Sequence, residues 1–267
     1  RLRGTWSDSS APWRHDPAPT VEQQEQSLAS AQRPHARTRL TTARASQAIP
    51  HTNQRTNMPE HFPSDIYTEP ANIDVDTLAN LGPLKPMAGI WQGERGLDVK
   101  PKAEGPKKQA YVERIELQPI DPQTNGPQLL YGLRYHTHIT KPGLVKTYHD
   151  QVGYWLWEPA TGTVIHTLTI PRGQTAMAAG TAAADAKSFE LVAQEGLQTW
   201  GICSAPFLQY AFRTVEFRIK VTVNDDGSWG YEEDTVLMIR GQAEPFHHTD
   251  RNLLKKIAEP TPNPLAR

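Results

Sequence analysis

The chain has 267 residues, of which 37% are hydrophobic, and its mean hydropathy is -0.61, with no apolar run long enough to cross a bilayer. Its 28 basic and 29 acidic side chains give a formal charge of -1, which excludes a general electrostatic attraction to nucleic acid or to anionic membranes. Cys203 is the single cysteine, so an internal disulfide and a cysteine-ligated zinc site within one chain are excluded.

The first 57 residues differ in chemistry from the rest. Residues 1–57 hold eight arginines, no lysine and four acidic residues, a local charge of +4 that leaves -5 for residues 58–267. This segment has neither helical nor strand periodicity and too few apolar residues for a core. Because Met58 opens a sequence of ordinary N-terminal character, we interpret residues 1–57 as a disordered or non-native upstream segment. A targeting peptide rich in arginine and serine is the alternative left open.

The next part of the chain leads into the predicted folded domain. Residues 58–77 are polar and marked by prolines, which predicts an extended arm. Asp76 is a suitable N-cap for a short helical turn with Leu78 on its apolar side. We expect a ligand-binding β-barrel over residues 78–258 and a flexible tail over residues 259–267.

Beyond Trp91 the pattern changes to the two-residue period of β-strands. "TVEFRIKVTV" alternates apolar and polar residues, and "NDDGSW" connects it to "GYEEDTVLMIRG", which predicts a hairpin around Gly227. Further strands are predicted in "AYVERIEL", "QLLYGLRYHTHI", "YHDQVGYWLW", "TVIHTLTIP", "TAMAAGTA" and "FELVAQ". These strands have no helices between them, so we predict an all-β, about ten-stranded antiparallel up-and-down barrel with short helices near both ends of the domain. A closed barrel also leaves no long sheet edge exposed.

Two stretches indicate how the interior of such a barrel is filled. In "GIWQGERG", Trp91 stands among glycines that let the first strand bend, so we interpret it as core packing at one end of the barrel. In "LTIPRGQTAMAAG", Ala176 and the small residues after it leave room for a ligand on the barrel wall. Arg172 in the same stretch is a planar donor suited to a carboxylate, with a surface position as the alternative.

The histidines do not form an obvious catalytic motif. His149 stands beside Asp150, but neighbouring strand residues point to opposite faces, which disfavours an acid-base pair. His136, His138 and His166 are predicted to be structural or surface residues. "EPFHHTDRNLLKKI" places two adjacent histidines where we expect a strand to give way to a C-terminal helix.

In combination these stretches resemble the nitrobindin family. The chain has "LGPLKPMAG" before a GxWxG motif, then "YHDQVGYW", then a turn ending in glycine before a strand of small residues, and last a histidine at the start of the expected C-terminal helix. The likeness covers roughly residues 78–257. Nitrobindins are haem-binding barrels related in shape to fatty-acid-binding proteins.

The resemblance implies one ferric haem b per chain, held in the barrel mouth by one axial histidine. It makes His248 the expected metal ligand, with His247 as the second candidate, and His149, Arg172 and Trp91 complete the residues expected to bind the cofactor. Neutral imidazole is a good iron ligand. Some nitrobindins bind nitric oxide or isomerise peroxynitrite to nitrate, so the resemblance implies such an activity, with turnover left open.

The same residues also depart from the family's pattern. If "HTDRNLLKKI" is laid on the family's last helix without a gap, Thr249 rather than His248 falls at the ligand position, and Thr249 is then a helix N-cap. The alternatives left open are a haem-free barrel that binds a fatty acid or another amphipathic molecule through Arg172 or Arg134, and an interaction domain with a filled barrel.

The expected partner is a small hydrophobic or macrocyclic ligand. We expect no nucleic-acid or membrane partner and a cytoplasmic location, since one cysteine fits a reducing compartment. A homodimer is left open.

Overall fold

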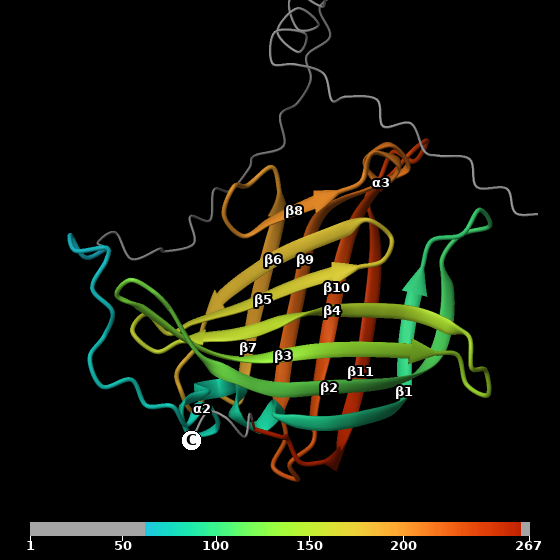
Figure 1. Cartoon of the computed structure of the whole chain (residues 1–267). Coiled ribbons are helices and arrows are strands. Elements are labelled where there is room, and N and C mark those ends of the chain that lie inside the picture. The colour runs from blue at the N-terminus through green and yellow to red at the C-terminus, as the bar shows by residue number, and fades with distance from the viewer. Residues whose placement is uncertain (1–61, 263–267) are drawn as a thin grey trace, which may run out of the picture. The chain divides into compact units, whose positions relative to one another are not determined.

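Eleven strands follow one another around a closed barrel in the computed structural model, which describes residues 62–262 (Figure 1). The expectations for residues 1–57 lie outside the described residues. The strands are β1 (Gly89–Lys100), β2 (Lys107–Asn125), β3 (Gln128–Thr140), β4 (Thr147–Glu158), β5 (Thr163–Ile170), β6 (Gln174–Thr181), β7 (Ser188–Glu195), β8 (Gly201–Ser204), β9 (Phe212–Val223), β10 (Trp229–Ile239) and β11 (Phe246–Ala258).

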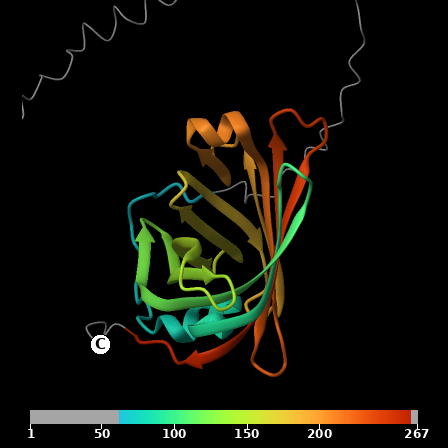
Figure 2. The same cartoon turned by 90° about the vertical axis from the view of Figure 1, so that its right-hand side faces the viewer.

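The order of the strands around the barrel is β1-β11-β10-β9-β7-β8-β6-β5-β4-β3-β2, and β2 closes the ring on β1. Every pairing is antiparallel except the one between β7 and the short β8. The predicted all-β antiparallel barrel is therefore confirmed, and Figure 2 shows it from a second side. No helix within residues 62–262 is long and apolar enough to span a bilayer.

The hairpin of β9 and β10 forms as the alternating sequence predicts. Phe217, Ile219 and Val221 on β9 are buried, and Gly227 in the turn has a φ of 81°, a conformation that favours glycine. A bulge lies between the pairs Val236–Glu216 and Leu237–Thr214, and the Thr214 side chain is buried in consequence.

Two short helical turns precede the barrel. In α2 (Thr77–Asn80) the Asp76 side chain accepts a hydrogen bond from the Ala79 amide at 3.1 Å, as expected of an N-cap. The 3-10 turn η1 (Gly82–Met87) follows directly and contributes buried side chains to the core. A third helix, α3 (Pro206–Ala211), connects β8 to β9 at the other end of the barrel (Figure 1).

Trp91 closes the end of the barrel that lies next to η1. Its side chain is 0% exposed, its Nε1 donates to the Met87 carbonyl oxygen at 2.8 Å, and its ring packs edge-on against Trp229 at 6.0 Å. The register between β1 and β2 shifts between Gly93 and Gly96, where the strand bends. A side chain on Gly96 would overlap the Tyr111 ring, so the bend requires glycine.

The predicted C-terminal helix is wrong. Residues 246–258 form β11, which pairs with β10 on one side and with β1 on the other. The physical reason is barrel closure, because without β11 both β1 and β10 would present unpaired backbone groups. The strand buries Asn252 and Leu254 and exposes Leu253, so the two adjacent leucines point to opposite faces of the sheet.

Candidate ligand cavity

A cavity of about 390 Å³ lies inside the barrel and reaches α3. Its volume falls in the range of small-molecule sites. One wall is apolar and is made of Leu168, Ile170, Ala176, Leu208, Phe212, Phe217 and Leu237. The other wall is polar and includes Asp98, Lys100, Tyr148, Glu233, His248 and Asp250. The cavity can therefore accommodate an amphipathic molecule, with its apolar part against the first wall and its polar part against the second.

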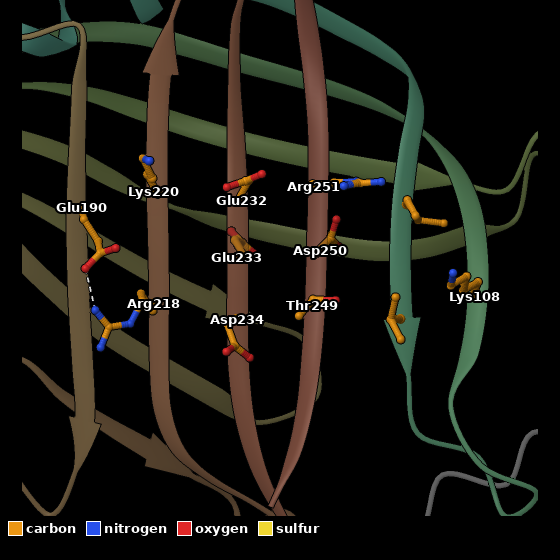
Figure 3. Close-up of a pocket in the computed structure, with 12 residues that line it drawn as sticks. Lys108, Glu190, Arg218, Lys220, Glu232, Glu233, Asp234, Thr249, Asp250 and Arg251 are labelled. Atoms are coloured by element: carbon orange, nitrogen blue, oxygen red, sulfur yellow. Dashed lines mark hydrogen bonds and ion pairs between the residues drawn. The ribbon is translucent and has the colours of Figure 1, made fainter.

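The strand β11 explains why two histidines stand side by side, because successive strand residues face opposite sides of a sheet. The His247 side chain is 59% exposed outside the barrel, and its Nδ1 lies 2.7 Å from Asp234 Oδ2. The His248 side chain lines the cavity, and its Nε2 lies 2.8 Å from Asp98 Oδ1. Thr249 lines a groove outside the barrel (Figure 3), and strand alternation places it on the same face as His247. Of these three candidates, His248 is the one inside the barrel.

Asp98 holds His248 in place from the neighbouring strand β1. This carboxyl is 3% exposed, accepts a hydrogen bond from the Tyr148 hydroxyl and lies 3.8 Å from Lys100 Nζ. Burial would raise the pKa of Asp98, but the hydrogen bonds from His248 and Tyr148 outweigh it and lower that pKa. An ionised Asp98 places the imidazole proton on His248 Nε2. The Nδ1 atom then carries a lone pair and has no hydrogen-bond partner among the described residues.

A second imidazole, that of His149 on β4, lines the same cavity. Its Nε2 lies 3.2 Å from Gln151 Oε1, and burial lowers its pKa, so the ring is neutral at neutral pH. The neighbouring Asp150 points outward and contacts His136 Nε2 at 3.0 Å. The prediction that His149 and Asp150 do not form an acid-base pair is confirmed.

Positive side chains stand at the mouth of the cavity. Arg172, in the turn between β5 and β6, donates to the Tyr148 carbonyl oxygen at 2.8 Å and lines the cavity. Lys100 Nζ lies 4.3 Å from the centre of the Tyr148 ring. These two cations can receive an anionic group at the entrance.

The other residues singled out in the sequence lie elsewhere. Trp91 is packed at the closed end and is not part of the cavity lining. Arg134 is exposed on the outer face of β3, and His138 there contacts Thr147. His166 is a core residue stacked on Trp155 at 3.9 Å, and burial lowers its pKa to about 3. The structure thus brings His248, His149 and Arg172 together and separates Trp91 from them.

Sequence reasoning missed a layer of carboxyl groups inside the barrel. Glu113 on β2 is 1% exposed and accepts hydrogen bonds of 2.8 Å from Tyr231 and Asn252. Burial raises the pKa of Glu113 to about 7. Asp250 and Glu233 line the cavity beside it. The sequence did contain a signal, because Glu113 in "YVERI" and Glu233 in "GYEEDTVL" occupy inward-facing positions of alternating stretches. Acidic residues are rare on a buried face, so these positions were overlooked.

The outer face of these strands carries a broad groove of about 490 Å³ (Figure 3). Charged side chains of both signs line it, and Arg218 Nη1 bonds Glu190 Oε1 at 2.5 Å. Because its charges are opposed by neighbours of the other sign and the face is open, the inner cavity is the better candidate for small-molecule binding.

Comparison with known proteins places this geometry in a family. The model of the THAP4-like, heme-binding beta-barrel domain matches residues 80–256, about two thirds of the chain. The crystal structure of Rv2717c from M. tuberculosis is similar at 22% sequence identity, covering 68% of this chain and 99% of that chain with a TM-score of 0.48. A search of the curated proteins gave no match. The chain belongs to the THAP4-like haem-binding β-barrel domain family, the nitrobindin family that its motifs resemble.

Proposed function

We propose that the barrel binds one haem b, with His248 as the axial ligand of the iron. The observation that carries this proposal is the position of His248, which faces the cavity and is held by the buried carboxylate of Asp98 at 2.8 Å. Histidines that ligate metals commonly donate their second nitrogen to a carboxylate, which orients the ring and increases its basicity. The pairing of His248 with Asp98 fits that role.

The remaining lining residues also fit the group. The apolar wall could cover a macrocycle, and Arg172 and Lys100 would hold its propionates. His149 lies in the same cavity as a second, neutral imidazole that can donate to or accept from a small ligand. No group of three or more histidine, cysteine, aspartate or glutamate side chains that could hold a metal ion occurs in residues 62–262.

A bound ferric haem would supply a site for nitric oxide or for the isomerisation of peroxynitrite to nitrate. The chain's own contribution to such chemistry is to shield the site with the apolar wall and to place the His149 ring at the cavity. If haem does not bind, the same mouth cations and apolar wall support the alternative of a fatty acid or another amphipathic ligand.

The test is a haemin titration followed by visible absorption, on the wild type and on His248→Ala, His247→Ala and Thr249→Ala. We expect a saturable, stoichiometric Soret shift that His248→Ala abolishes and the two outer-face variants preserve. The absence of a saturable shift in the wild type would overturn haem binding. A shift lost in Thr249→Ala but kept in His248→Ala would overturn the assignment of the ligand.

A further inference from the structure

Two carboxyl groups stand opposite each other inside the barrel. Glu233 on β10 and Asp250 on β11 are direct partners in the antiparallel ladder, and both line the cavity. The Cβ atoms of such pairs are about 4.5–5.5 Å apart, and like charges placed directly opposite destabilise a sheet. Two ionised carboxyl groups at these positions would repel each other, and a proton on one of them or a cation between the strands would relieve the repulsion.

Glu233 differs from the other interior acids in lacking a partner. Asp98 is bonded by His248 and Tyr148, and Asp250 accepts from the Tyr111 hydroxyl. Glu233 has neither a hydrogen bond nor an ion pair to any described residue, although it is enclosed by the barrel. Burial and the charges of Asp250 and Glu113 raise the pKa of Glu233 well above its ordinary value. The fold itself therefore provides no cation for this group.

A second observation, independent of the carboxyl groups, points to a polar occupant at the inner end of the cavity. A smaller chamber of about 50 Å³ adjoins the cavity, and Glu233 and Asp250 line both spaces. Three ring nitrogens of residues lining this chamber lack hydrogen-bond partners, namely Trp155 Nε1, His166 Nδ1 and Trp229 Nε1. These side chains are 2%, 1% and 1% exposed. Buried polar atoms without partners are costly, and the chamber has room for water that could bridge them to the carboxyl groups.

The acids and the apolar wall lie in the same cavity. Leu168, Ala176 and Phe217 contribute to an apolar surface that continues to α3, while Glu233 and Asp250 supply negative charge. We propose that this cavity binds an amphipathic organic cation, with a protonated amine against Glu233 and Asp250 and an alkyl chain along the apolar wall. The proposal goes beyond haem binding and does not depend on it, because the residues that carry it are not the imidazoles.

The charge distribution favours a cation over a fatty acid at this depth. A carboxylate head next to Glu233 would add a negative charge to a group of acids that already repel one another. An alkylammonium stays protonated up to about pH 10 and stabilises the ionised carboxyl group.

The experiment is a calorimetric titration of the haem-free full-length chain with three ligands of one shape, n-octylammonium, 1-octanol and octanoate. We expect the ammonium to bind about ten- to a hundred-fold more tightly than the alcohol, the scale of a hydrogen bond to a charged group. Octanoate reports the mouth cations Arg172 and Lys100, so its affinity should not fall in Glu233→Gln.

Two matched variants each remove one carboxyl group from β10, one from its inner face and one from its outer face. Glu233→Gln should reduce the ammonium affinity to that of octanol while octanol binding, which reports an intact cavity, is unchanged. Glu232→Gln removes the same charge from the exposed neighbour (Figure 3) and should preserve the preference. Should Glu233→Gln lose octanol binding as well, Asp250→Asn provides the same measurement on the partner strand.

An ammonium that binds no better than octanol to the wild type would overturn the proposal, as would a preference that survives both inner substitutions. These titrations contain no haemin. A failed Soret titration would leave them intact, and a failed amine titration would leave haem binding intact.

Discussion

The closed end of the barrel and the layer above it follow opposite rules. At the closed end Trp91, Trp229 and Leu254 are 0%, 1% and 0% exposed and form an ordinary apolar core. One layer closer to the mouth, Glu113 and Asp250 carry carboxyl groups inside the barrel, and burial raises the pKa of each. Burying acids costs free energy that folding does not require. The closed end therefore stabilises the barrel, whereas the acidic layer lies where the proposed organic cation would bind.

The largest effect should come from breaking the closed end. Trp91→Ala removes the indole that seals the barrel and leaves a cavity, so we expect a loss of about 3–5 kcal/mol in the free energy of unfolding. The matched control is Tyr154→Ala, since Tyr154 is 42% exposed on the outer face of β4 and its loss should change the stability by about 0.5 kcal/mol or less. Urea unfolding measures both, and equal losses would contradict the division between core and surface.

The buried acids should make the free energy of unfolding depend on pH. Burial raises the pKa of Glu113 to about 7 in the folded protein from 4.5 for a solvated glutamate, so the folded state binds more protons between these values. Stability is therefore highest at low pH within this window and falls as the pH rises through it, by roughly 3 kcal/mol for this group.

Glu113→Gln isolates that contribution. Glutamine can still accept from Tyr231 and Asn252 but cannot ionise. We expect unfolding measured from about pH 5 to about pH 8 to show a shallower decline in the variant than in the wild type. If the free energy of unfolding declined equally with pH in both proteins, the pKa of Glu113 would be the same in the folded and unfolded states, which would contradict the effect of its burial.

A smaller effect should follow when the carboxylate behind His248 is neutralised. Asp98→Asn keeps the size of the side chain but weakens the hydrogen bond that orients the imidazole. Outer-shell changes of this kind cost about 10–100-fold in metal affinity, so haemin should bind more weakly by that factor. Asp150→Asn is the control, because Asp150 lies outside the barrel against His136. Equal haemin affinities in the two variants would argue against Asp98 as the orienting residue.

The sequence could predict those parts of the fold that depend on local patterns. Two-residue alternation identified the barrel and the hairpin at Gly227, and the glycines around Trp91 identified its packing role, because each depends on a local pattern. The last strand was mistaken for a helix, since its pairing with β1 closes the ring between residues far apart in the sequence. The same error hid Asp250 and its position opposite Glu233, which only the register of β10 and β11 reveals.

The smallest effect on stability is expected at His247, which lies outside the barrel and which the sequence alone could not distinguish from His248 as the candidate ligand. His247 meets Asp234 at 2.7 Å, but its side chain is 59% exposed, so solvent and salt screen the pair. His247→Ala should lower the free energy of unfolding by about 1 kcal/mol or less, and added salt should reduce the difference further. A loss as large as that of Trp91→Ala would show that the outer face of β11 supports the barrel as strongly as its core. A small loss would leave the inner face of the strand, with His248 and Asp250, as the side on which substitutions change ligand binding.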